Sequence, residues 1–512
     1  MTDPIQLDRR GFMALAAAGT LVAPGVAHAA PKRGGILRVA APTNPTTLDP
    51  CTGNGGSDHP FLYPIYDTLV TWDYATLEPR PGLALDWSYP SPDKFVMNLR
   101  PGVLFHDGTP CDAEAVAFNL ERGRSAPESN VKPDFATISK IEVTGPLQVT
   151  LTLNQPDTSL PLAFSDRTGM MCSPTAVKAL GKEHDRKPVG AGPWKFVRWD
   201  DAEKVVVTRN EKYWNPEKPY LDGIEMSVIL EVNTGLRSAV AGQNDFVYFL
   251  SPQQKAVIDR AKNLTPATGP TLYCVQLYIN FGRKPFDDKR VRLALNYAID
   301  REEFNKATMA GLSEPATLSL PKSHWAHDPE MAKYYTYDPD KARKLLAEAG
   351  YANGLDVLLA CYPDQRSQQR VEVLIEQFRK VGIRINTFAG TIPQQTNAFF
   401  AEKKGDIYLS AWTGRPDPSQ TYALMFGEGS FYNASRIAAV PELMPALMET
   451  KKYQDIPARK QAFAKLQKIV TENALVAPLL FQFEMDAYAH KVKGYQPNLL
   501  GKPKFENVWL EG

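Results

Sequence analysis

The sequence is poor in cysteine and has almost no net charge. Its 512 residues include five cysteines, which are scattered and form no CxxC pair. A chain of this length can bury a large apolar core, so we expect no disulfide framework, and one bridge would still leave a free thiol. Lysine and arginine total 58 against 57 acidic residues, for a net charge of +1. This balance gives no indication of nucleic acid or a membrane surface as a partner.

Catalytic and cofactor signatures are also missing. The sequence contains no GxSxG elbow, no P-loop and no HExxH helix. We therefore expect no enzyme activity, no cofactor and no metal site. His324 and His327 are close in sequence, but prolines flank them, which favours a surface pair in a loop over two metal ligands.

The N-terminus has an apolar run that is too short to span a membrane. Residues 14–26 fall below the roughly 20 residues that a bilayer requires and are interrupted by glycine and proline. The run follows Arg9 and Arg10 and precedes a small-x-small cleavage site, so we interpret residues 1–29 as a twin-arginine signal peptide. No cysteine lies at the cleavage site. We therefore expect an unanchored, soluble protein in the periplasm of a Gram-negative bacterium.

The remaining sequence predicts a mixed α/β fold of two or three domains. The 42 prolines favour short strands and turns in the first half, whereas longer amphipathic helices alternate with strands after residue 280, as in βα units over a parallel sheet. Asp287 and Asp288 are expected to cap a helix. The predicted strands are 36–41, 95–99, 195–199, 204–208, 356–360, 384–387 and 406–411, and the predicted helices are 113–122, 288–299, 339–348, 368–381 and 458–472.

Several segments, in this order along the chain, resemble one protein family. They are GGILRVA (34–40), TTLDP (46–50), YDTLV (66–70), FVMNLRPGVLFHDGTP (95–110), PVGAGPWKFVRWD (188–200), NFGRKPFDDKRVRLALNYAIDREEF (280–304) and YDPDKARKLLAEAGY (337–351). The chain is similar to the bacterial extracellular solute-binding proteins of family 5, which serve ABC importers of peptides, nickel and opines and include the dipeptide-binding proteins.

The resemblance implies a two-lobe periplasmic binding protein of type II, in its large three-domain variety. Lobe I would comprise about residues 31–275 and 485–512, with an inserted subdomain near 80–185, and lobe II residues 276–484. The protein would be a monomer that closes on a small solute and delivers it to the transmembrane subunits of an ABC permease.

The segment DIYLSAWTGRPDPS (406–419) is the first candidate binding site. A predicted strand ends there and releases Trp412, Arg415 and Asp417 into a loop shaped by glycine and proline, where α/β folds place ligand groups. The resembled dipeptide-binding proteins carry an acidic residue at the position of Arg415. The reversed charge indicates an anionic group on the solute, with an exposed turn arginine as the alternative. Asp417 would hold Arg415 or receive an amine.

Further candidates come from three other segments. By loose similarity, Arg366 lies near the arginine with which dipeptide-binding relatives hold a carboxylate, and Arg370 is close to it. Tyr278 and Phe481 are candidates for stacking on the solute together with Trp412. Asn54, in the polar loop 53–58, would line the cleft, unless that loop is an ordinary surface turn.

Three functions remain open on sequence alone. The first is a receptor for a carboxylate-bearing solute, such as a short peptide, an opine or a modified amino acid. The second is a receptor for a metal chelate, haem or a glutathione-like solute. The third is an exported cofactor enzyme, which only the twin-arginine signal favours.

Overall fold

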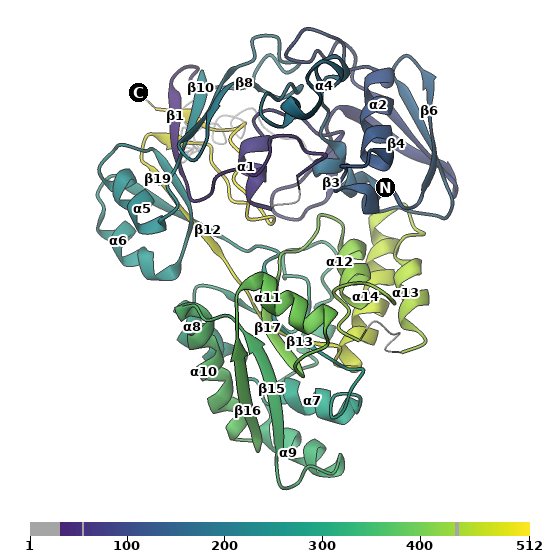
Figure 1. The fold of residues 1–512 in the computed structure, drawn as a ribbon, viewed down its shortest axis with the longest axis vertical. Coiled ribbons are helices and arrows are strands. Elements are labelled where there is room, and N and C mark those ends of the chain that lie inside the picture. The colour runs from purple at the N-terminus through teal and green to yellow at the C-terminus, as the bar shows by residue number, and fades with distance from the viewer. Residues whose placement is uncertain (1–30, 54–55, 436–439, 512) are drawn as a thin grey trace, which may run out of the picture.

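The computed structural model describes residues 31–53, 56–435 and 440–511. The expected signal peptide, 1–29, and Asn54 lie outside the described residues. Figure 1 shows two bodies, one above the other, which we call lobe I and lobe II, with strands running between them. Among the described residues, no helix combines the length and apolarity needed to cross a membrane.

Lobe I is built on a seven-stranded sheet of order β12-β19-β11-β1-β10-β9-β8. β1 pairs in parallel with β10 and β11, and the other neighbours are antiparallel. The strands are β1 (Ile36–Ala41), β8 (Trp194–Asp200), β9 (Lys204–Arg209), β10 (Gly223–Val228), β11 (Phe246–Leu250), β12 (Leu264–Gly269) and β19 (Glu484–Ala489). β19 comes near the end of the chain, so the C-terminal segment returns to complete this sheet.

A second part of lobe I is a four-stranded antiparallel sheet of order β4-β5-β7-β6, at the upper right of Figure 1. α2 (Ala113–Ser125) packs against it and begins at Asp112, whose side chain accepts a hydrogen bond from the Ala115 N–H. The alternating burial of β5 and β7 places every second residue in a core of its own. The strands are β4 (Ala84–Ser91), β5 (Lys94–Leu99), β6 (Ile138–Gly145) and β7 (Gln148–Leu153).

Short elements complete lobe I. The helices are α1 (His59–Leu62), α3 (Leu160–Ala163), α4 (Pro174–Leu180), α5 (Val232–Val240) and α6 (Lys255–Arg260), with 3₁₀ turns η1 (Gly56–Asp58), η2 (Lys132–Phe135), η3 (Arg167–Gly169), η4 (Gly181–Asp185) and η5 (Pro252–Gln254). Two small ribbons pair β2 (Val70–Trp72) with β3 (Pro79–Pro81) and β20 (Val492–Lys493) with β21 (Trp509–Leu510).

Lobe II is built on a six-stranded sheet of order β14-β18-β13-β17-β15-β16. β15 runs parallel to β16 and β17, whereas β13, β14 and β18 pair antiparallel, so the sheet is mixed rather than wholly parallel as expected. The strands are β13 (Cys274–Ile279), β14 (Glu314–Pro315), β15 (Leu355–Cys361), β16 (Ile383–Ala389), β17 (Ile407–Trp412) and β18 (Val476–Phe481).

Helices cover the lobe II sheet, and aspartates begin six of them. The side chains of Asp288, Asp300, Asp338, Asp364, Asp417 and Asp455 each accept a backbone N–H in the first turn, which satisfies donors that a helix leaves unpaired. The helices are α7 (Lys289–Tyr297), α8 (Arg301–Met309), α9 (Pro339–Glu348), α10 (Gln365–Arg379), α11 (Ile392–Thr396), α12 (Pro418–Phe426), α13 (Leu443–Glu449) and α14 (Ile456–Glu472), with short turns η6 (Met331–Lys333) and η7 (Asn397–Ala401).

The chain passes between the lobes in two adjacent segments, 270–273 and 482–483, which we call the crossover segments. Thr271 Oγ1 donates to the Gln482 carbonyl oxygen at 2.7 Å, and the Gln482 N–H donates to the Tyr273 carbonyl oxygen at 2.8 Å. These bonds tie the two crossover segments together.

The expected helix cap at Asp288 is confirmed, but the histidine pair differs from expectation. His324 lies in a loop yet is buried, with only 3% of its surface exposed, and its Nδ1 accepts the Ala326 N–H at 3.0 Å. The ring of Trp325 packs beside it. The expected loop is confirmed, but the expected surface position is wrong for His324. Flanking prolines predict a turn and carry no information about whether that turn is buried.

Candidate functional site

The candidate site lies where strands of lobe II end toward lobe I. β15 and β17 are parallel, so their carboxyl ends reach the same edge of the sheet, and β13 begins at that edge because Cys274 pairs with Trp412. Arg366 lies in the first turn of α10, which follows β15, and Arg415 lies in the loop that follows β17. The topology therefore brings together two arginines that are far apart in sequence.

Arg415 projects from the loop between β17 and α12. Gly414 adopts a φ of +73° and packs against Leu272 of a crossover segment, where a Cβ atom would come within 2.3 Å of the leucine side chain. The Arg415 side chain is exposed. Burial raises the pKa of Asp134, a lobe I residue, and the charge of Arg415 opposes this shift. Arg415 therefore acts electrostatically on groups of the opposite lobe.

Asp417 is not available to a solute or to Arg415. Its side chain is fully buried and accepts hydrogen bonds from the backbone and hydroxyl of Ser419, at 2.9 and 2.6 Å. Arg459 Nη2 donates to both of its carboxylate oxygens, at 3.1 and 2.9 Å. The structure thus corrects our expectation for Asp417, which caps α12 and fixes the loop to α14.

The three aromatic candidates belong to the lobe II interior. Tyr278 packs edge-on against Phe400, and Phe481 is 1% exposed in a cluster with Cys274. Trp412 is 7% exposed, and its indole N–H donates to Thr421 Oγ1 at 3.1 Å. Stacking of a solute on Tyr278 or Phe481 is therefore not supported, and Trp412 acts as a support of the loop.

The first two turns of α10 carry Arg366 and Arg370, and Arg370 contacts Gln482 of a crossover segment. Arg370 is buried, its Nη2 donates to Gln482 Oε1 at 3.0 Å, and its Nε has no acceptor in the described structure. Burial lowers the pKa of Arg370 to about 10. Arg366 is half-buried and opposes the rise that burial gives the pKa of Glu484, which reaches about 8. This corner of lobe II is therefore positively charged and partly dehydrated.

Lobe I presents polar and charged side chains toward this region. Arg167 Nη2 binds the buried Asp58 at 3.0 Å, and Thr168 Oγ1 donates to Asp134 at 2.7 Å. Lys502, on the C-terminal segment, is half-buried, and burial lowers its pKa to about 8. The charge of Arg415 also lowers the pKa of Lys502, which places the two cations within electrostatic reach.

The lobes also touch on the side of α12, α13 and α14 (Figure 1). Gln420 of α12 donates to Asp134 at 3.1 Å, and Lys451 pairs with Asp157 at 3.4 Å. Gln454 donates to the Tyr89 carbonyl oxygen at 3.1 Å. Lobe II therefore rests on the four-stranded part of lobe I through a small number of polar contacts.

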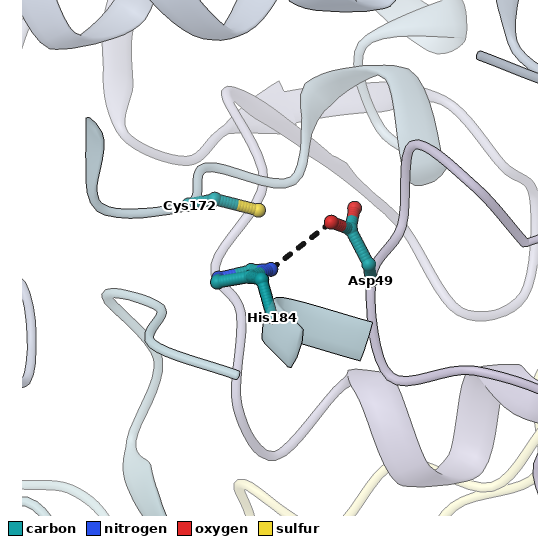
Figure 2. Close-up of side chains that lie close together, drawn as sticks. All are labelled: Asp49, Cys172 and His184. Atoms are coloured by element: carbon teal, nitrogen blue, oxygen red, sulfur yellow. Dashed lines mark hydrogen bonds and ion pairs between the residues drawn. The ribbon is translucent and has the colours of Figure 1, made fainter. Parts of the chain in front are cut away.

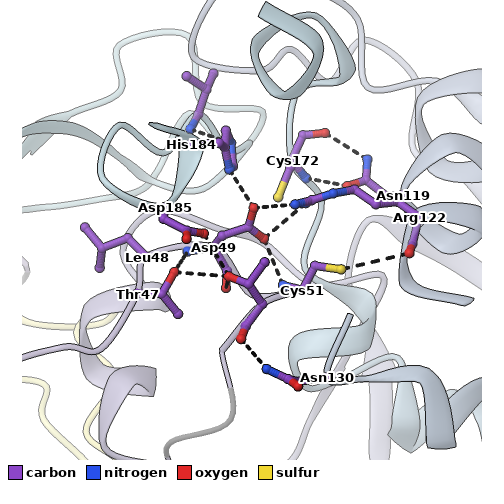
Figure 3. A network of polar contacts seen from close by, with 12 residues as sticks. Thr47, Leu48, Asp49, Cys51, Asn119, Arg122, Asn130, Cys172, His184 and Asp185 are labelled. Atoms are coloured by element: carbon purple, nitrogen blue, oxygen red, sulfur yellow. Dashed lines mark hydrogen bonds and ion pairs between the residues drawn. The ribbon is translucent and has the colours of Figure 1, made fainter. Parts of the chain in front are cut away.

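One buried cluster has the residue types of a metal site but not the free atoms. Asp49, Cys172 and His184 approach one another in lobe I (Figure 2). Arg122 donates to both oxygens of Asp49, at 3.1 and 2.6 Å, and His184 Nδ1 donates to it at 3.0 Å (Figure 3). His184 Nε2 accepts the Val189 N–H at 3.3 Å. Both ring nitrogens and the carboxylate are thus occupied, and the guanidinium would repel a cation.

Sequence reasoning missed three charged groups that face the region between the lobes. Asp134, Glu484 and Lys502 lie in unrelated segments, and no motif connects them. A signal was available only for Lys502, which lies between Gly501 and Pro503 in a stiff stretch of the kind that positions functional side chains.

The chain matches a known protein family. Residues 78–433 match the family described as bacterial extracellular solute-binding proteins, family 5 middle. Glutathione-binding protein GsiB of Shigella flexneri serotype 5b (strain 8401) is 30% identical over 509 residues, covering 95% of this chain and 96% of the relative. The chain therefore belongs to the family 5 solute-binding proteins.

Solved structures show the same fold. Periplasmic binding protein DppA from Helicobacter pylori, in complex with the peptide STSA, has a TM-score of 0.78 at 24% identity and covers 94% of this chain and 99% of its own. AgaA from A. tumefaciens R10, in complex with agropinic acid, has a TM-score of 0.77 at 22% identity and covers 93% and 99%. The expected two-lobe type II fold is confirmed. The protein is the periplasmic substrate-binding component of an ABC importer.

Proposed function

We propose that the solute carries a carboxylate or a similar anionic group and binds between the lobes against Arg415. One observation carries this proposal. Arg415 is an exposed guanidinium on a constrained loop that faces lobe I, and no hydrogen bond or ion pair within the described structure occupies it. A guanidinium offers two parallel donors to a carboxylate, which gives orientation as well as affinity.

The neighbouring charges support the same solute class. Arg370 is buried without a carboxylate partner and with an Nε that donates to no acceptor in the described residues, and Arg366 lies one turn away. Burying a guanidinium without an opposite charge raises the free energy of the protein, and an anionic ligand beside the guanidinium offsets part of that increase. Short peptides, opines and modified amino acids all carry such groups. Glutathione is a specific candidate, because the relative GsiB is described as glutathione-binding.

The remaining expectations form part of the same proposal. Lobe I comprises about residues 31–275 and 485–512, with an inserted subdomain near 80–185, and lobe II comprises about residues 276–484; the sheets themselves divide slightly differently, because Cys274 and Val275 belong to β13 and Glu484 belongs to β19. The protein is a monomer without catalytic activity, and the twin-arginine pathway exports it. Support for the lobe limits comes from β19, which pairs with β11 and β12 of the first sheet although it follows lobe II in the chain.

Titration calorimetry with matched pairs of solutes tests the solute class. The panel contains reduced glutathione, di- and tripeptides and an opine, each compared with a derivative whose carboxylates are amidated or esterified. We expect the acidic form of at least one compound to bind and its neutral derivative to bind at least about 100-fold more weakly, as when a desolvated charge pair loses one partner. Equal affinity for both forms would contradict the proposal.

A further inference from the structure

Lys502 sits on a rigid part of the C-terminal segment. Its carbonyl oxygen accepts from Asn498 Nδ2 at 2.7 Å, and the Gly501 N–H donates to the Asn498 carbonyl oxygen at 2.9 Å. Gly501 has a φ of +64°, and a Cβ atom there would lie 3.1 Å from both Glu484 and Thr271, next to the crossover segments. The backbone of Lys502 is therefore anchored where the lobes join.

Among the residues that the structure describes, none forms a hydrogen bond or an ion pair with the Lys502 ammonium, although the side chain is half-buried. Three nearby lysines of the same C-terminal segment are each paired: Lys491 with Asp245, Lys493 with Glu511 and Lys504 with Glu506. A dehydrated ammonium without an acceptor is unfavourable, so this group is arranged for an anion that comes from outside the chain.

The carboxylates that act on the charge of Lys502 are already engaged by other side chains. His59 Nδ1 contacts the Gly56 carbonyl oxygen at 3.0 Å, and its Nε2 contacts Asp166. Burial lowers the pKa of His59 to about 4. The Asp166 carboxylate is thus held by the His59 ring, and Asp58 pairs with Arg167.

Contacts between the lobes place Lys502 opposite Arg415. The Lys502 Cε atom lies 3.9 Å from the Cβ position of Gly56, beside the loop that ends at Asp58. Asp58 binds Arg167, the neighbouring Thr168 donates to Asp134, and Asp134 accepts from Gln420 in the first turn of α12. Arg415 lies just before that helix. The charge of Arg415 acts on Asp134, that of Lys502 acts on Asp166, and the charge of Arg415 also acts on Lys502.

We propose that Lys502 of lobe I and Arg415 of lobe II bind the same anionic group of the solute, so that the anion itself draws the lobes together. This inference rests on the proposed function and extends it to a second, specificity-determining residue. Without an anion, the two like charges repel and favour separated lobes, and an anion between them reverses the sign of the interaction.

The first test needs no solute. Nitroxide labels on Lys182→Cys and Glu372→Cys, two exposed positions on opposite lobes, report the distance between the lobes in the empty protein. The five native cysteines are buried and do not compete for the label. We expect Lys502→Met and Arg415→Met each to shift the distribution toward shorter distances, and the double variant to add no further shift. High salt should shorten the wild-type distance and leave the Lys502→Met distance unchanged.

The second test measures binding of reduced glutathione by calorimetry. Lys502→Met should weaken binding by about 10-fold or more, with a smaller dependence on salt. Lys493→Met is the matched control, because Lys493 lies in the same segment but pairs with Glu511 at the surface. The Lys493→Met variant should bind glutathione with the same affinity as the wild type.

The outcomes distinguish the proposed function, an anionic solute bound by Arg415, from the present inference that Lys502 binds the same anion. Identical distances in wild type and Lys502→Met overturn the inference, whether or not glutathione binds. Weaker binding in Arg415→Met with unchanged binding in Lys502→Met overturns this inference alone. Unchanged binding in both variants overturns the inference and the proposed function together.

Discussion

Asp417 and Arg459 form a buried ion pair that fixes the loop of Arg415. Arg459 Nη2 contacts the two Asp417 oxygens at 2.9 and 3.1 Å, and Arg459 Nε donates to the Thr450 carbonyl oxygen at 3.1 Å. The pair joins the start of α12 to α14 from inside the lobe. The exposed guanidinium of Arg415 therefore extends from a loop whose base cannot shift independently of the helices.

Asp417→Ala should destabilise lobe II rather than simply weaken binding. The change leaves Arg459 buried without its carboxylate, which should lower the free energy of unfolding by about 3 kcal/mol or more. Urea unfolding monitored by circular dichroism measures the loss. Glu376→Ala, which breaks an exposed ion pair with Arg379 on the same lobe, is the control and should leave stability unchanged. Equal stability of Asp417→Ala and wild type would contradict the structural role.

Glu484→Gln should raise stability at alkaline pH. Burial raises the pKa of Glu484 from 4.5 to about 8 in the folded protein, with Asp486 adding to the shift and Arg366 opposing it. Between pH 4.5 and pH 8 the folded state binds more protons at Glu484 than the unfolded state does. The free energy of unfolding therefore falls as pH rises through this range, because the buried carboxyl must ionise. At pH 8 the variant should melt about 2 °C higher than wild type, with no gain at pH 4. A gain of equal size at both pH values would contradict this account.

The five thiols should be unreactive in the folded protein. Each cysteine is buried and free, and burial raises each thiol pKa. Ellman's reagent should therefore modify almost nothing under native conditions and five thiols per chain in denaturant. Fewer than five thiols after denaturation of freshly prepared protein would reveal a disulfide and contradict the structure.

Export should depend on the paired arginines near the N-terminus. Replacing Arg9 and Arg10 by lysine should retain the precursor in the cytoplasm, because the twin-arginine translocase recognises that pair. Cell fractionation and immunoblotting measure the effect, and a strain that lacks the translocase should show the same retention. Unchanged export in that strain would contradict the assignment.

The longer secondary-structure elements were the predictable ones, because local signals define them. The helix 339–348 was predicted with the observed limits, since Asp338 and Pro339 mark its start and apolar residues recur along one face. The mixed sheet of lobe II was not predictable. β13 and β18 are buried on both faces, and such a strand gives no periodic signal of its direction or of its neighbours.

The same burial explains why two of the candidate site residues lie in the core of lobe II. Tyr278 and Phe481 lie on those two strands, so a ligand-facing side could not be distinguished from the core. Arg415 was found because a loop between a strand and a helix carries its own signal in glycine and proline. Lys502 was not found, because its significance depends on the partners of His59, Asp58 and Arg167, which only the folded chain brings together.

Native mass spectrometry of protein isolated from the periplasm of its own host tests the central claim most directly. The wild type should carry a bound small molecule that fragments with the loss of an anionic group, and Arg415→Ala isolated in parallel should be largely empty. Arg415→Lys should retain the same molecule at reduced occupancy, because an ammonium cannot form the two parallel bonds of a guanidinium. A bound molecule without an anionic group, or equal occupancy in the wild type and Arg415→Ala, would contradict the account.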